Sequence, residues 1–137
     1  METLSVEGIL DKGLESESLL SELEWPIFVV AYLESIADME GWDHFFTYNL
    51  AWYSQLLDIL RLSGDFRSLG IIKDYENHLI KHGVEFKQES IDAFLTKAPD
   101  DYFDSCPDWR EQFQSNSESR WKLIERYYSD KGLRVKT

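Results

Sequence analysis

The fold is decided by the stretch WPIFVVAYLESIA, residues 25–37. Proline is well tolerated in the first turn of a helix, where its missing N–H has no helical partner, so Pro26 indicates a helix start. Apolar side chains then recur at spacings of three and four around a wide part of the helix circumference, wider than the stripe of a surface helix. The pattern predicts a central helix that packs on more than one side.

Further helical patterns follow this central helix along the chain. Large apolar side chains recur at helical spacing in residues 50–62, 66–82 and 89–97, and again from Ser115 or Ser117 to Gly132. Ser63-Gly64-Asp65 separates the first two patterns, because glycine adopts the left-handed backbone of a turn and aspartate caps helix N-termini. Residues 99–108 contain two prolines and several aspartates, which indicates loops or a single turn.

These patterns predict an all-α fold of one compact domain with about six or seven helices, spanning residues 1–137. Residues 1–14 and 133–137 are expected to be loose ends, and no run of residues alternates convincingly as a strand does. With 43% hydrophobic residues and five Trp, seven Tyr and eight Phe, the chain has enough apolar surface for one core. The composition excludes a disordered acidic tail, and the single cysteine excludes an internal disulfide framework.

The negative charge lies almost entirely in the first half of the chain. Residues 1–60 contain twelve acidic side chains and one basic side chain, Lys12, whereas residues 61–137 contain fourteen acidic and thirteen basic ones. The first half therefore holds nearly all of the formal net charge of -12. Such a field repels nucleic acid and anionic membranes and attracts basic partners.

The sequence shows no export or membrane signal. The first ten residues contain two glutamates and no basic side chain, unlike the positive start of a signal peptide. The longest apolar stretch, residues 25–33, is far shorter than the roughly twenty residues of a membrane span. Together with the free Cys106, which fits a reducing compartment, these features predict a cytoplasmic protein.

Eight carboxylates of the first half are candidates for a docking surface. Carboxylates four positions apart on a helix lie about 6 Å apart along its axis, so two facing helices can approximate two rows of phosphates. Almost no basic residue is interleaved with them, so they cannot neutralise one another. A merely solvated face is the alternative. The predicted partner-binding residues are Glu15, Glu17, Glu22, Glu24, Glu34, Asp38, Glu40 and Asp43.

A glycine turn followed by clustered aromatic residues comes next, in MEGWDHFFTYN, residues 39–49. With the helix of residues 50–62 and the segment LIERYY, residues 123–128, it resembles the bacterial DNA-mimic protein family over roughly residues 25–130. The resemblance implies an all-helical acidic protein that can form a homodimer. In a characterised member of that family, carboxylates form a DNA-like surface that occupies a helix-turn-helix regulator.

We therefore expect a non-enzymatic binding module that docks on a basic protein, such as a DNA-binding regulator, as a DNA mimic. An immunity-type inhibitor of a basic toxin, such as a nuclease, is the alternative, because it relies on the same acidity. Neither function involves direct binding of nucleic acid or of a membrane. No cofactor and no metal are expected.

Signals for catalysis or metal binding are weak. Asp74, His78 and His82 share one helix face, and histidines at this spacing can bind zinc, but no third strong ligand is evident beyond Asp74 or Glu85. A solvated face on which Asp74 pairs with His78 is the favoured interpretation. Cys106 has no histidine near it in the sequence to act as a base, so a buried or loop cysteine is expected.

Three more features have structural and functional alternatives. His44 is expected at the edge of the core with a hydrogen bond to the backbone, or else at a partner contact. Trp25 and Trp109 are candidates for exposed interface anchors beside acidic residues. A second acidic cluster lacks the spacing of a calcium loop and is expected to cap helices or to extend the acidic surface; it consists of Asp100, Asp101, Asp104 and Asp108.

Overall fold

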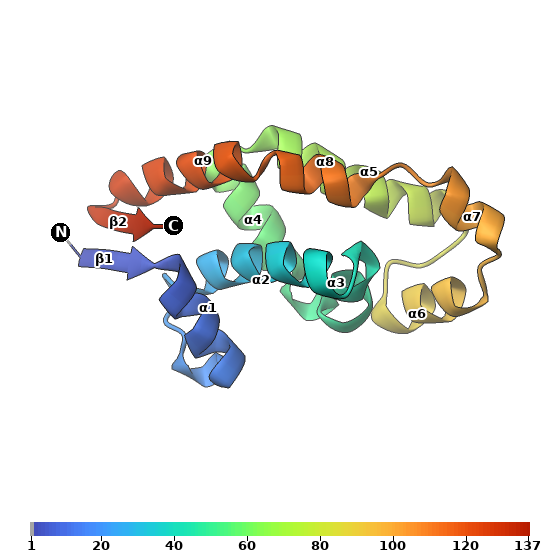
Figure 1. Ribbon diagram of the computed structural model, residues 1–137, viewed down its shortest axis with the longest axis horizontal. Coiled ribbons are helices and arrows are strands. Elements are labelled where there is room, and N and C mark those ends of the chain that lie inside the picture. The colour runs from blue at the N-terminus through green and yellow to red at the C-terminus, as the bar shows by residue number, and fades with distance from the viewer. Residues whose placement is uncertain (1) are drawn as a thin grey trace.

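Helices make up most of the chain in the computed structural model, which describes residues 2–137 (Figure 1). The prediction of an all-α, single-domain protein is confirmed. The helices are α1 (Val6–Glu15), α2 (Trp25–Met39), α3 (Trp42–Tyr48), α4 (Tyr53–Ser63), α5 (Phe66–Lys81), α6 (Gln88–Lys97), α7 (Asp100–Ser105), α8 (Trp109–Ser115) and α9 (Ser117–Ser129). Two 3-10 turns, η1 (Glu17–Leu19) and η2 (Leu50–Trp52), and two strands, β1 (Glu2–Ser5) and β2 (Leu133–Lys136), accompany them.

Helix α2 lies at the centre of the fold, as its sequence predicts. Its side chains from Ile27 to Val30 are buried almost completely, and so is Leu33. Pro26 stands in the first turn, and α1, α3 and α4 all pack against the helix. A helix that is apolar on most sides must be covered on most sides, which explains its position.

The helices form two layers (Figure 1). In one layer α2, α3 and α6 follow one another, and in the other α9, α8, α5 and α7 do so. Helix α4 crosses between the layers and packs against both α2 and α9. The turn before α5 forms as predicted: Gly64 has a left-handed φ of 83°, and the Asp65 carboxylate accepts a hydrogen bond from the Ser68 N–H at 3.1 Å.

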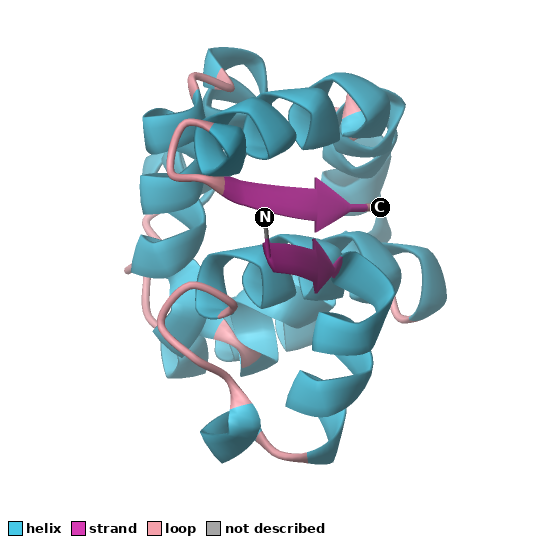
Figure 2. Ribbon diagram, turned by 90° about the vertical axis from the view of Figure 1, so that its left-hand side faces the viewer, coloured by secondary structure: helices cyan, strands magenta, loops and turns pink. Residues whose placement is uncertain are grey.

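Both ends of the described chain form regular secondary structure, so the prediction of loose ends at residues 1–14 and 133–137 is wrong for residues 2–14 and 133–136; Met1 lies outside the described residues. Strands β1 and β2 pair in parallel, with Glu2 opposite Leu133 (Figure 2). Leu4, Leu133 and Val135 are buried under this small sheet. The alternation in residues 133–136 is a strand signal, but four residues are too few to distinguish from chance.

Helix α1 also forms where a loose end was expected. The Ser5 hydroxyl caps it by accepting a hydrogen bond from the Gly8 N–H at 3.1 Å, and Ile9 and Gly13 face the core. Helix α7 forms within residues 99–108, where loops or a single turn were expected, and α8 follows directly from Trp109. In these segments the burial of a few large side chains outweighs the weak local helix signal.

Gly13 is required where α1 crosses α2. A Cβ at this position would lie 2.5 Å from two ring atoms of Phe28, a side chain that is itself buried in the core. We expect Gly13→Ala to lower the free energy of unfolding by about 1–3 kcal/mol through overpacking. Gly70→Ala, in α5 with open space around it, should raise it by up to about 1 kcal/mol. Chemical denaturation measures both, and equal effects would contradict this account.

Candidate acidic interface

A row of acidic side chains runs along the outer face of α1. Glu7, Asp11 and Glu15 are four residues apart and exposed, so successive carboxylates lie about 6 Å apart along the helix. Glu17 follows in η1 and is also exposed. Figure 1 shows α1 and η1 projecting from the body of the molecule. Glu7 and Asp11 are not among the predicted partner-binding residues because residues 1–14 were expected to be a loose end, although their spacing of four indicates a shared helix face.

Exposed leucines accompany these carboxylates. Leu14 lies three residues after Asp11 and seven after Glu7, hence on the same helix face, and is 60% exposed. Leu19 of η1 is 48% exposed. Apolar side chains set among charges are typical of protein interfaces. We call this feature the α1 surface and define it as Glu7, Asp11, Leu14, Glu15, Glu17 and Leu19.

The single basic residue of the first sixty is engaged inside this segment. Lys12 Nζ lies 2.7 Å from a carboxylate oxygen of Glu24, and the Ser21 N–H donates to the other oxygen at 2.9 Å. Partial burial acts to raise the pKa of Glu24, but the Lys12 ammonium and the Ser21 N–H outweigh it and lower that pKa below its ordinary value. Glu24 is therefore a structural anchor and does not belong to a free docking surface, contrary to prediction.

Glu34 is also used inside the protein, which corrects the prediction that it binds a partner. Its carboxylate accepts hydrogen bonds from Arg120 Nε at 3.0 Å, from the Ser117 hydroxyl at 2.9 Å and from Trp121 Nε1 at 3.0 Å. Arg120 is completely buried and stacks on the Phe113 ring, 3.6 Å from its centre. A basic residue of the second half thus neutralises this carboxylate.

Asp43 is the third predicted partner-binding residue whose carboxylate is bound within the fold. Its carboxylate accepts a hydrogen bond from the Tyr75 hydroxyl at 2.6 Å. Burial raises the pKa of Asp43, although the Tyr75 hydrogen bond acts in the opposite direction. The pKa of Tyr75 is also raised, by burial and by the Asp43 charge. Asp43 therefore links α3 to α5 and does not face a partner.

The remaining predicted residues are exposed, but they do not form one continuous row. Glu15 and Glu17 belong to the α1 surface, and Glu22 lies in the loop before α2. Asp38 shares a shallow depression with Glu7, which brings the end of α2 close to the start of α1. Glu40 follows α2 and is exposed.

Helix α5 brings together the histidines and the cysteine that were distant in sequence. Cys106 Sγ lies 3.8 Å from His78 Nε2, and the His78 and His82 rings are 4.5 Å apart. Asp74 accepts a hydrogen bond from Trp109 Nε1 at 2.8 Å and does not pair with His78. Burial raises the pKa of the Cys106 thiol, which disfavours the nucleophilic thiolate. Residues 2–137 contain no group of three or more His, Cys, Asp or Glu arranged to hold a metal ion.

Three aromatic or polar predictions have clear outcomes. Trp109 is buried, so the prediction of an exposed anchor is wrong there, and Trp25 is half-buried against Phe28 and Trp52. His44 lies at the core edge, but its buried Nδ1 has no hydrogen-bond partner in the described chain. In the second acidic cluster Asp108 caps α8 by accepting a hydrogen bond from the Glu111 N–H at 3.0 Å, as expected for helix capping.

Comparison of the chain with protein-family models, curated proteins and solved structures finds no significant match. The resemblance to the DNA-mimic family therefore stays a prediction from sequence. Within residues 2–137, no helix has both the length and the apolar character that a membrane crossing requires.

The Glu34–Arg120 ion pair gives a first test of this site. Glu34→Gln leaves a completely buried guanidinium without its counter-charge, so we expect the free energy of unfolding to fall by about 3 kcal/mol. Asp38→Asn, four residues further on α2 and exposed, should change it by less than about 0.5 kcal/mol. Urea denaturation measures both, and a similar small loss in the two variants would exclude a structural role for Glu34.

Asp43 gives a pH-dependent test. Since burial raises its pKa in the folded state, the folded wild type is favoured by protonation and loses that stabilisation as pH rises through the raised pKa. Asp43→Asn has no such titration and keeps an oxygen that can accept the Tyr75 hydrogen bond. We expect the stability of this variant, relative to wild type, to increase between about pH 3 and about pH 7. Thermal denaturation at each pH measures it, and a relative decrease would contradict the assignment.

Proposed function

We propose that this protein is a non-enzymatic binding protein that docks on a basic protein, a DNA-binding regulator, in the manner of a DNA mimic. The observation that supports the proposal is the α1 surface, where exposed carboxylates at regular spacing surround exposed leucines on a projecting helix. No lysine or arginine neutralises this row from within α1, since Lys12 pairs with Glu24.

The physical basis is electrostatic attraction followed by apolar contact. A concentrated negative field raises the association rate of a positively charged partner and repels duplex DNA itself. Carboxylates about 6 Å apart along α1 present charges at a spacing comparable to that of phosphates on nucleic acid. Leu14 and Leu19 are exposed and would be buried against an apolar patch of the partner. DNA has no such side chains, so the surface favours a protein partner that also provides an apolar contact.

Charge neutralisation tests the proposal. The immobilised protein is used to capture partners from a lysate, which mass spectrometry identifies, and the captured protein is then purified for affinity measurement. We expect a basic partner whose affinity falls at least about tenfold between about 50 mM and 500 mM salt. The same loss is expected at low salt in a variant of the α1 surface that carries Glu7→Gln, Asp11→Asn, Glu15→Gln and Glu17→Gln.

A matched control removes four exposed acidic side chains from the second half of the chain: Asp92→Asn, Asp101→Asn, Asp104→Asn and Asp130→Asn. The control should bind the partner like wild type, and circular dichroism should show that both variants keep their helices. Equal loss in both variants, or an affinity unaffected by salt, would remove the proposal. The identity of the captured protein then distinguishes a DNA-binding regulator from a basic toxin.

A further inference from the structure

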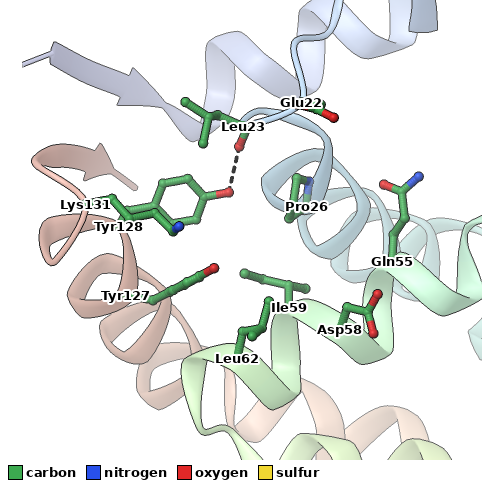
Figure 3. Close-up of a pocket in the computed structure, with 10 residues that line it drawn as sticks. All are labelled: Glu22, Leu23, Pro26, Gln55, Asp58, Ile59, Leu62, Tyr127, Tyr128 and Lys131. Carbon is green, nitrogen blue, oxygen red and sulfur yellow. Dashed lines mark hydrogen bonds between the residues drawn. The ribbon is translucent and has the colours of Figure 1, made fainter.

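A cleft of about 270 Å³ opens between the start of α2, helix α4 and helix α9 (Figure 3). Its apolar walls come from Pro26, Ile59 and Leu62. Two carboxylates, Glu22 and Asp58, stand on one side, and Figure 3 shows Lys131 on the opposite side. The cleft therefore combines an apolar interior with a negatively charged edge.

Several polar groups of this cleft are not used by the fold. The side chains of Glu22 and Gln55 and the Tyr127 hydroxyl have no hydrogen-bond partner in residues 2–137, and Figure 3 shows this hydroxyl pointing into the cleft. The neighbouring Tyr128 differs, because its hydroxyl donates to the Leu23 carbonyl at 2.6 Å (Figure 3). Polar groups at the rim of an apolar cleft can fix the orientation of a group that binds there.

The cleft already accommodates a cation on its aromatic face. Lys131 Nζ lies 5.1 Å from the centre of the Tyr127 ring, within the range of a cation–π contact. Asp58 pairs with Arg61, but both side chains are largely exposed, so this ion pair is weak and exchangeable. A second cation that reached the cleft would meet the Glu22 carboxylate, and it would compete with Arg61 for Asp58 and with Lys131 for the face of Tyr127.

The size of the cleft limits its occupant. Small-molecule sites usually measure about 300–1,000 Å³, and this cleft lies just below that range, which favours a single long side chain. An arginine has an apolar stem that suits Pro26, Ile59 and Leu62. Its planar guanidinium can stack on an aromatic ring such as Tyr127 or pair with a carboxylate through two parallel hydrogen bonds, which a lysine ammonium does less well.

We propose that this cleft receives an arginine side chain of the basic partner. The inference rests on the proposed function and makes it more specific, because it names the recognised group and its pocket. The loop of residues 20–24 joins the cleft to η1, so one partner can contact the α1 surface and the cleft together. Lys131 competes with the incoming guanidinium for the Tyr127 ring and must move aside.

Short peptides test the cleft without any knowledge of the partner. Acetyl-Gly-Arg-Gly-amide is titrated into the full-length, nitrogen-15-labelled protein, and backbone amide shifts are followed by NMR. We expect shifts confined to residues 22–26, 55–62 and 127–131. The corresponding lysine peptide should bind more weakly, and the uncharged glutamine peptide should cause no shifts.

Two substitutions in the cleft are expected to change the affinity for the arginine peptide in opposite directions. The double variant Glu22→Gln with Asp58→Asn should lower the affinity for the arginine peptide at least about fivefold. Lys131→Gln should raise that affinity, because the cation that competes for the Tyr127 ring is removed. Glu89→Gln with Asp92→Asn removes two exposed carboxylates outside both the cleft and the α1 surface; it is the matched control and should bind the peptide like wild type.

Shifts spread over the acidic surface, no shifts at all, or equal binding of the glutamine peptide would each overturn the cleft assignment. These outcomes can be separated from failure of the proposed function. If the α1-surface variant loses the basic partner while the Glu22 and Asp58 double variant retains it, the docking proposal stands and the arginine cleft is wrong.

Discussion

The buried ion pair between Arg120 and Glu34 is the interaction on which the two-layer fold depends. A guanidinium without exposure to water must have its donors satisfied, because burying an unpaired charge costs several kcal/mol. Besides Glu34, Arg120 donates to the Ser68 hydroxyl at 3.0 Å and to the Phe113 carbonyl at 2.9 Å. Helix α9 is thereby fixed to α2, α5 and α8 at once, and the network continues through Asn116, which donates to Ser68 and Asp65.

This interior use of charge divides the acidic residues of the first half into two groups. Glu24, Glu34 and Asp43 hold elements together and are paired with Lys12, Arg120 and Tyr75. Those that remain exposed on α1 and η1 have no such role in the fold. Because like charges on one helix face repel, an unpaired row costs stability, and the proposed docking on a basic partner would give that cost a function.

The segment between α1 and α2 positions both parts of the proposed interface, the α1 surface and the cleft. The Lys12–Glu24 ion pair fixes the loop that leads into α2, and the Tyr128 hydroxyl holds the Leu23 carbonyl from α9. The loop carries Glu22 to the edge of the cleft while η1 stays on the outer side. The loop of residues 20–24 thus connects the α1 surface to the cleft.

The sequence by itself determined the central helix and the helices that follow it up to residue 97, together with the last helix, because the spacing of apolar residues, Pro26, Gly64 and Asp65 are local signals that specify helix faces and ends. It also determined that the first half is acidic. It did not reveal α1 or α7. Only the tertiary structure decided which carboxylates are free, since Glu34 meets Arg120 at a separation of 86 residues and Asp43 meets Tyr75 at 32. The pairing of β1 with β2 and the burial of Trp109 against Asp74 are equally non-local. Periodicity encodes which face of a helix is buried, but it carries no information about which distant side chain will meet it there.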